Sequence, residues 1–356
     1  MAKQDIRTLT SSELKEAIVG LGEKAFRAKQ IEEWLWTKGA ASFEQMSNLS
    51  KGFRERLDAA FELNRIEVAD QQFSSDGTIK CAFDVRAGQV VEGVLIPTSK
   101  RMTACISSQV GCSLACKFCA TGRLKLLKNL SAGEIYDQVE MIRDMAKEHY
   151  NQGLTNIVYM GMGEPLLNYR SVLESVERIC GDPGLAMSPK RITVSTAGIA
   201  KAIKRLGDDQ VRFNLALSLH AANDEKRNRI MAINESNNLE ALAEALQYFY
   251  KKTGTRVTFE YIIFRDFNDQ LEDAQELPVS VGTILIGRYR VVSVIGKGSF
   301  SRVVQCYDLQ TSKSVSVKVL HNDKDCVDQG IGEVRLLSLL AQRDPTGEAR
   351  AHTRGR

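Results

Sequence analysis

Three thiols stand close together in the segment GCSLACKFCATG, residues 111–122. They belong to Cys112, Cys116 and Cys119, which are separated by three residues and then by two. A structural zinc site takes four ligands, usually as two pairs, so it would need a distant fourth ligand such as Cys105. A 4Fe-4S cluster held by three cysteines keeps one iron open for another ligand. The spacing favours such a cluster, while zinc binding and an inert buried trio remain the alternatives.

Polar groups also follow three predicted strands further along the chain. One strand, NIVYMG, leads into the glycines of GMG and then Glu164. Glycines there would let a ligand approach the backbone and a carboxylate can hold an ammonium group, but a plain strand-to-helix turn has the same residues. Ser195 in TVSTAG and Ser218 with His220 in LSLHA follow the next two strands, although a lone histidine is more often a packing residue. Together with the cysteine loop, these loops predict a binding site.

The elements that would position these loops form a repeating pattern after Arg101. Strands are predicted at MTACISSQV, NIVYMG, RITVST, FNLALSL and RVTFEYIIF, and helices at about residues 131–150, 169–180, 199–206 and 239–252. Ser131 and Glu134 form a predicted capping box at the start of the first helix. Repeated βα units of this length predict a parallel sheet, open or curled into a barrel, with its functional loops at the carboxyl ends of the strands.

A small α+β domain is predicted before this pattern. Apolar residues recur at helical intervals from about residue 12 to 63, and strand-like alternation covers 65–97 around glycine turns at 76–77 and 87–88. The 356-residue chain carries 48 Lys+Arg against 44 Asp+Glu, which permits a polyanionic partner without requiring one. We find no signal peptide and no apolar run of roughly 20 residues. We therefore expect a soluble, cytoplasmic protein whose eight cysteines stay reduced.

The segment CSLACKFC matches the CxxxCxxC signature of radical S-adenosylmethionine enzymes. With SSQVGC before it, and with GMGEPLLN, SLHA, FRAKQIEEWLW and VEGVLIP elsewhere, residues from about 26 to 277 resemble the RlmN family of adenine-C2 RNA methyltransferases. The resemblance implies a partial (β/α) barrel with a 4Fe-4S cluster on Cys112, Cys116 and Cys119. The fourth iron would chelate the amino and carboxylate groups of S-adenosyl-L-methionine, and an electron from the cluster would cleave that cofactor to a 5'-deoxyadenosyl radical.

Particular residues match functional positions of the family. Glu92 matches its proton acceptor and Cys105 the thiol that resolves a covalent protein–RNA adduct. The alternatives are a solvated strand carboxylate and a small buried hydrophobe. Gly163 and Glu164 match the contact to the methionyl amine of the cofactor. Further cofactor contacts match Ser195, Ser218, Leu219 and His220.

The family's reaction and partners follow from the same resemblance. Carbon 2 of adenine is not nucleophilic, so the family methylates a cysteine near its own C-terminus, abstracts hydrogen from that methyl group and adds the carbon radical to the base. Its substrates are an adenosine of 23S rRNA and adenosine 37 of certain tRNAs, which implies that the N-terminal domain grips RNA. An electron donor such as flavodoxin or ferredoxin and a monomeric state are implied as well.

The sequence departs from the family at Pro278. The family's last barrel strand, a cofactor-binding asparagine and the methyl-carrying cysteine are not visible after it, so we expect this chain to methylate RNA poorly or not at all. Residues 284–340 instead resemble the N-terminal lobe of a eukaryotic protein kinase. In that resemblance ATP would be held by Gly296, Gly298, Val303, Lys318 and Glu333. HRD, DFG and APE segments do not follow, so we expect no kinase activity.

These patterns predict domains at residues 1–97, 98–278 and 279–340, followed by a disordered tail at 341–356. Three function classes stay open. They are a radical methyltransferase, an ATP-binding kinase-like fragment or pseudokinase fused to a non-catalytic iron–sulfur or RNA-binding module, and a non-enzymatic RNA-binding or zinc protein. The resemblance favours the first class, and Cys306 and Cys326 are interpreted as incidental rather than as replacement methyl carriers.

Overall fold

The computed structural model describes residues 3–86, 88–255 and 257–269, together with the backbone of four later strands. The chain divides into two compact units. The first comprises Met1–Ser218 with Asn228–Phe259, and the second Leu219–Arg227 with Glu260–Arg356.

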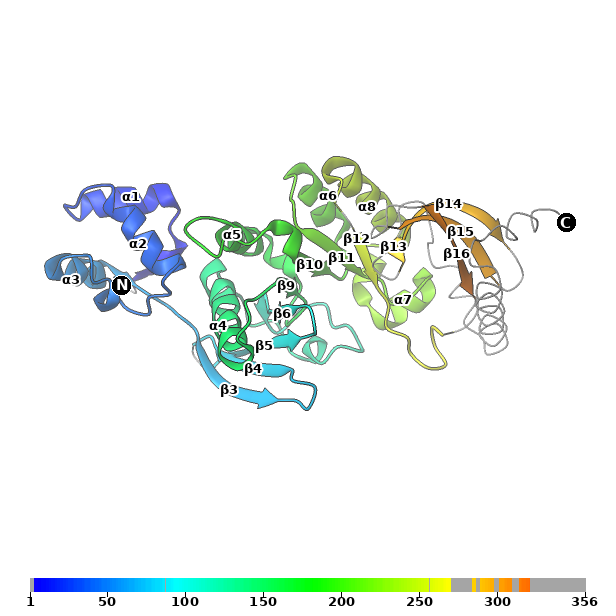
Figure 1. Cartoon of the computed structure of the whole chain (residues 1–356), viewed down its shortest axis with the longest axis horizontal. Coiled ribbons are helices and arrows are strands. Elements are labelled where there is room, and N and C mark those ends of the chain that lie inside the picture. Colours follow the sequence, from blue (N-terminus) through cyan, green and yellow to red (C-terminus); the bar gives the residue numbers. More distant parts are fainter. Residues whose placement is uncertain are drawn as a thin grey trace, which may run out of the picture. The chain divides into compact units, whose positions relative to one another are not determined.

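Three short helices form the N-terminal part of the first unit, which confirms the predicted helical segment. They are α1 (Ser11–Gly20), α2 (Arg27–Trp36) and α3 (Lys51–Ala60), at the blue end of Figure 1. Thr10 and Glu13 form a capping box at the start of α1, and the Ser50 side chain caps α3. Each helix buries an apolar stripe that includes Ile18, Ile31 or Leu57. Shorter elements beside them are β1 (Gln4–Asp5), η1 (Ile6–Thr8), η2 (Phe43–Gln45) and β2 (Phe61–Glu62), with β1 and β2 paired in parallel.

A mixed sheet of eight strands follows, in the order β12-β11-β10-β9-β6-β5-β4-β3. The antiparallel strands are β3 (Glu67–Phe73), β4 (Ile79–Asp84) and β5 (Val90–Pro97), which pair in turn up to β6 (Met102–Cys105). From β6 the pairing is parallel through β9 (Asn156–Tyr159), β10 (Ile192–Thr196) and β11 (Asn214–Ser218), with β12 (Val257–Glu260) next in order. The parallel strands confirm the predicted βα pattern.

The helices between the parallel strands also confirm the sequence predictions. They are α4 (Ala132–Tyr150), α5 (Tyr169–Cys180), α6 (Ala200–Asp208) and α8 (Leu239–Thr253). A further helix, α7 (Asp224–Ile230), was not predicted. Three 3-10 turns accompany them: η4 (Pro165–Asn168), η5 (Pro189–Arg191) and η6 (Ala232–Glu235). The predicted capping box of Ser131 and Glu134 begins α4. A Cβ added at Gly93 of β5 would lie 3.1 Å from Ile142 of α4, so this helix packs closely on the sheet.

The sheet runs across the domain boundary predicted at residue 97. Val94 of β5 pairs with Cys105 of β6, so the antiparallel strands and the barrel strands share one hydrogen-bonded sheet. Residues 67–97 are therefore hydrogen-bonded through β5 to the parallel part of the sheet. The physical reason is that a hairpin in isolation leaves a strand edge unpaired, whereas here β5 finds its next partner in β6.

Beyond residue 283, the described backbone forms an antiparallel sheet in chain order. Its strands are β13 (Ile284–Leu285), β14 (Tyr289–Lys297), β15 (Ser301–Asp308) and β16 (Ser314–Leu320). Val303 is in register with Gly296 on one side and with Lys318 on the other. Gly298, Glu333 and the predicted tail 341–356 lie outside the described residues. Among the helices that are described, none combines the length and apolar character needed to cross a membrane.

Candidate active site

The cysteine loop follows β6 and folds tightly on itself. Its short elements are β7 (Gln109–Val110), η3 (Thr121–Arg123) and β8 (Lys128–Asn129), and β7 pairs with β8. Gly111 has φ +77°, and a Cβ there would collide with the carbonyl oxygen of Lys125. A Cβ on Gly122 would lie 2.5 Å from the carbonyl oxygen of Cys116. Both positions therefore require glycine, because the loop backbone approaches itself too closely for a side chain.

The three loop thiols are partly exposed, and no disulfide joins the cysteines that the structure describes. The N–H of Cys119 donates to the carbonyl oxygen of Cys116 at 3.2 Å. Burial raises the pKa of Cys112, and the charges of Glu164 and Cys119 raise it further. The Glu164 carboxyl and the Cys112 and Cys119 thiols therefore lie near one another, and a bound cationic centre would favour their charged forms.

This donor set fits an iron–sulfur cluster better than a single zinc ion. The loop supplies three thiols, whereas a structural zinc ion takes four ligands around one centre. A tetrahedral zinc ion needs each thiolate about 2.3 Å from a single centre. A cluster instead spreads its thiolates over separate irons.

Buried polar side chains just before the cysteine loop connect it to the neighbouring strands. Ser107 Oγ donates to the carbonyl oxygen of Glu92 at 2.6 Å and accepts from the N–H of Met162 at 2.7 Å. The side-chain oxygen of Gln109 accepts from the N–H of Glu164 at 2.7 Å. The motif spacing does not predict these roles. The available signal was the polar run SSQ at the end of a buried strand, where each polar group needs a partner.

Glu164 is buried and joins the ends of two strands. Its Oε1 accepts from the N–H of Leu166 at 3.0 Å, and its Oε2 accepts from the N–H of Ala197 at 2.7 Å. Burial raises the pKa of Glu164, although these hydrogen bonds act to lower it. An ammonium partner would therefore favour the charged carboxylate. Gly163 has φ +97°, and a Cβ there would lie 2.5 Å from the Cβ of Gln109. Packing alone therefore accounts for glycine at position 163.

Four of the predicted site residues share one face of the sheet. Glu92 lies two residues before Val94 on β5, and Val94 is in register with Cys105 on β6. Residues two apart on a strand, and residues in register on neighbours, point to the same face. The register continues over β9 and β10 to Ser195 and over β11 to Ser218, whose hydroxyl oxygens are 3.5 Å apart.

Glu92 and Cys105 are both reachable from solvent. The Glu92 carboxylate is about half exposed and lies 2.6 Å from the ammonium of Lys80 on β4. Cys105 is partly exposed, unlike the fully buried Cys81. Their proposed roles as proton acceptor and resolving thiol remain predictions.

Leu219 and His220 belong to the second unit. His220 has φ +54°, and its Nδ1 accepts from the N–H of Ile262 at 3.1 Å. The proton of the neutral ring is therefore on Nε2. Burial and the nearby Arg227 lower the pKa of His220 to about 4, so the ring is neutral at pH 7. Asn268, which the motifs did not indicate, donates 2.7 Å hydrogen bonds to the carbonyl oxygens of His220 and Ile262.

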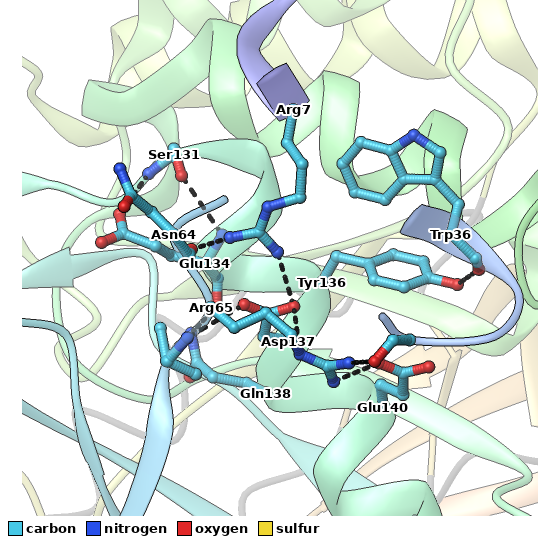
Figure 2. A network of polar contacts seen from close by, with 12 residues as sticks. Arg7, Trp36, Asn64, Arg65, Ser131, Glu134, Tyr136, Asp137, Gln138 and Glu140 are labelled. Atoms are coloured by element: carbon cyan, nitrogen blue, oxygen red, sulfur yellow. Dashed lines mark hydrogen bonds and ion pairs between the residues drawn. The ribbon is translucent and has the colours of Figure 1, made fainter. Parts of the chain in front are cut away.

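A buried polar network joins the N-terminal segment to α4, the helix that follows the cysteine loop. Figure 2 shows Asp137 of α4 with the guanidinium groups of Arg7 and Arg65. Arg65 also pairs with Glu140, and the Tyr136 hydroxyl donates to the carbonyl oxygen of Trp36.

One residue further along α4, Gln138 contacts the strand end that leads to the cysteines. Its Oε1 accepts from the N–H of Ser107 at 2.9 Å, and its Nε2 donates to the carbonyl oxygen of Ser107 at 3.1 Å. Helix α4 therefore contacts both the N-terminal segment and the residues before the cysteine loop.

Comparisons with known proteins agree with this architecture. Residues 106–277 match the radical SAM superfamily, and residues 4–63 match the ribosomal RNA large subunit methyltransferase N-terminal domain. A solved radical SAM methyltransferase from Sphaerobacter thermophilus superposes with a TM-score of 0.72 at 37% identity, covering 77% of this chain and 80% of that one. Fold and site thus define a radical S-adenosylmethionine enzyme.

Curated relatives specify the family. A probable dual-specificity RNA methyltransferase RlmN from Cytophaga hutchinsonii is 50% identical over 341 residues, covering 94% of this chain and 93% of that protein. A dual-specificity RNA methyltransferase RlmN from Anaeromyxobacter dehalogenans is 42% identical over 277 residues, covering 77% of this chain and 74% of that protein. The chain belongs to the RlmN family of dual-specificity RNA methyltransferases.

The kinase resemblance of residues 284–340 finds no support in these comparisons. A match over 94% of the chain, as with the C. hutchinsonii relative, reaches well past Pro278. The antiparallel strands β13–β16 are therefore no reason to assign an ATP site to this chain.

Proposed function

We propose that this chain methylates carbon 2 of adenosine in 23S rRNA and at adenosine 37 of tRNA, by radical S-adenosylmethionine chemistry. The observation that carries the proposal is the convergence of the CxxxCxxC loop with Glu164 at the carboxyl ends of parallel strands. The N–H of Glu164 donates to Gln109, which lies directly before the cysteine loop. The charges of Glu164 and Cys119 both act on Cys112.

The chain's own residues have separate tasks in this proposal. Cys112, Cys116 and Cys119 hold a 4Fe-4S cluster through three thiolates. When bound, the cluster and S-adenosyl-L-methionine supply a 5'-deoxyadenosyl radical. Glu164 receives the ammonium of the cofactor, and a buried carboxylate suits that task because a charge-assisted hydrogen bond is strong where water is excluded. Within the first unit, further polar contacts to the cofactor come from Gly163, Ser195 and Ser218, while the cofactor contacts matched by Leu219 and His220 remain predictions.

The reaction with RNA takes place at the face of the sheet that carries Glu92 and Cys105. Glu92 takes the proton that leaves the substrate base. The Cys105 thiolate then attacks the sulfur of the protein–RNA adduct, so that a disulfide to the methyl-carrying cysteine forms, the sulfur–carbon bond breaks, and the released carbon takes up a proton to become the methyl group. The two residues lie on neighbouring strands of one face, which supports their acting on the same base. The N-terminal helices grip the RNA, and an electron donor such as flavodoxin or ferredoxin reduces the cluster. We place the reaction in the cytoplasm, carried out by a monomer.

The test separates cofactor chemistry from methyl transfer. Anaerobically reconstituted protein is incubated with dithionite, S-adenosylmethionine and 23S rRNA or tRNA, and both 5'-deoxyadenosine and C2-methyladenosine are quantified. We expect 5'-deoxyadenosine to form, and to be lost in Cys116→Ala. We expect C2-methyladenosine to form with it, because the match to the family reaches well past Pro278. Absence of 5'-deoxyadenosine from the unmodified chain would refute the proposal, and 5'-deoxyadenosine without C2-methyladenosine would instead agree with the weak methyl transfer that the sequence after Pro278 predicts.

A further inference from the structure

A cationic and apolar surface lies directly beside the cysteine loop. In the segment Arg123–Leu127, every residue is exposed, and the side chains of Leu124 and Leu127 are 51% and 64% exposed. Five consecutive exposed residues of the type Arg-Leu-Lys-Leu-Leu are unusual on a free surface, because exposed leucines tend to mark a contact site when they gather. We call Arg123–Leu127 together with Lys117 the RLKLL surface.

The charge of this surface has one sign. Residues 111–129 contain Lys117, Arg123, Lys125 and Lys128 and lack Asp and Glu altogether. Only Lys128 of these four has an ion-pair partner in the part of the chain that the structure describes, namely Glu134. The other three cations are exposed, so their field extends into solvent and favours an acidic partner.

The RLKLL surface is fixed to the cysteine loop by backbone contacts. The N–H of Cys112 donates to the carbonyl oxygen of Leu124 at 3.4 Å, and the N–H of Leu127 donates to that of Val110 at 2.8 Å. On the other side of the loop, the N–H of Lys117 donates to the carbonyl oxygen of Ile230 at 3.0 Å. A macromolecule bound to this surface would therefore lie next to the thiols of the cysteine loop.

We propose that the RLKLL surface docks an acidic one-electron carrier protein, which reduces the cluster. This inference rests on the proposed function, since it assigns a partner to the same loop. In the step itself, one electron leaves the reduced flavin or iron–sulfur centre of the carrier and enters the cluster, and no bond forms or breaks. The leucines supply the apolar contact and the cations orient the partner, a combination typical of small transient interfaces.

The test uses reduced flavodoxin as the probe and a charge-reversal variant, Arg123→Glu/Lys125→Glu, in the full chain. The matched control is Lys201→Glu/Lys251→Glu, which changes the net charge equally at two exposed lysines on α6 and α8. We measure the association rate and the Kd for flavodoxin, the rate of cluster reduction by flavodoxin, the 5'-deoxyadenosine formed with dithionite, and the Kd for tRNA. The flavodoxin affinity can be measured whether or not the cluster is loaded.

We expect Arg123→Glu/Lys125→Glu to lower the flavodoxin association rate about tenfold or more, with an effect that shrinks at high salt. The control variant should bind flavodoxin as the unmodified protein does. In Arg123→Glu/Lys125→Glu, the dithionite-driven cleavage of S-adenosylmethionine and the affinity for tRNA should stay unchanged. Leu127→Ser should weaken flavodoxin binding with an unaltered salt dependence. An unchanged flavodoxin affinity overturns the inference, and so does a loss of tRNA affinity alone, which would assign the surface to RNA. Failure of dithionite-driven cleavage in the unmodified chain refutes the proposed function instead.

Discussion

Replacing Asp137 by asparagine should strongly destabilise the first unit. The Asp137 side chain is 2% exposed and lies 2.7 Å from Arg7 Nη1 and 3.6 Å from Arg65 Nε. Its second oxygen accepts from the N–H of Ile66 at 3.2 Å. Asparagine preserves the shape but removes the charge. The equally buried Arg7 then keeps the more distant Asp5, at 3.8 Å, as its ion-pair partner among the described residues, and its Nη2 still donates to the carbonyl oxygen of Asn64.

The magnitude follows from the burial of the unpaired guanidinium. Removing one partner of a buried pair costs about 3–5 kcal/mol of unfolding free energy, because the remaining charge stays desolvated. Arg65 retains Glu140 and Arg7 retains Asp5, so we expect the lower end, about 3 kcal/mol. For a unit of this size, that loss lowers Tm by about 6–12 °C.

Urea and thermal unfolding of Asp137→Asn, followed by circular dichroism, test this estimate. The control is Glu244→Gln, which breaks the exposed Lys204–Glu244 pair, 3.6 Å apart, and should cost less than about 1 kcal/mol. The double variant Arg7→Met/Asp137→Leu removes both charges and should be more stable than Asp137→Asn alone. If Asp137→Asn costs no more than the control, the network does not anchor the N-terminal segment and the reasoning is wrong.

Two further predictions concern the cysteine loop and the second unit. Gly122→Ala places a Cβ 2.5 Å from the carbonyl oxygen of Cys116, so roughly half or more of the bound iron should be lost at reconstitution, whereas Gly153→Ala, with no atom within 4 Å, should bind iron normally. Burial and Arg227 hold the pKa of His220 near 4, below its unfolded value of about 6.5. As pH falls between these values the unfolded chain takes up the proton first, so stability drops by roughly 2 kcal/mol from pH 7 to pH 5. In urea titrations, the unfolding free energy of His220→Gln should fall less between pH 7 and pH 5 than that of the unmodified protein. An equal fall in both proteins would contradict the lowered pKa of His220.

The periodic elements could be predicted because their sequence signals are local. The helix at 169–180 and the capping box of Ser131 and Glu134 are confirmed, since apolar spacing and cap residues act within one or two turns. The CxxxCxxC spacing also predicts a cluster loop from one short segment, and the roles of its three cysteines as ligands remain predictions. Glycine at position 163 was predicted for ligand approach, and the structure adds a packing reason that depends on Gln109, 54 residues earlier.

Long-range partners could not be predicted in the same way. The pairing of β5 with β6 joins residues 67–97 to the parallel strands in one sheet, and nothing local in either strand specifies that partner. The bonds from Gln138 to Ser107 and from Asp137 to Arg7 likewise join segments that are remote in sequence. A polar residue at a strand end signals that it needs a partner, but the partner itself is set by the packing of the whole sheet.

The central claim is that Cys112, Cys116 and Cys119 hold a 4Fe-4S cluster. Iron, sulfide and zinc are measured per chain after anaerobic reconstitution, in the unmodified protein, in Cys116→Ala and in Cys180→Ala, a partly exposed cysteine outside the loop. We expect about four irons and four sulfides per chain in the unmodified protein and in Cys180→Ala, with most of both lost in Cys116→Ala. About one zinc per chain without sulfide, or iron content that Cys116→Ala leaves unchanged, would contradict the account.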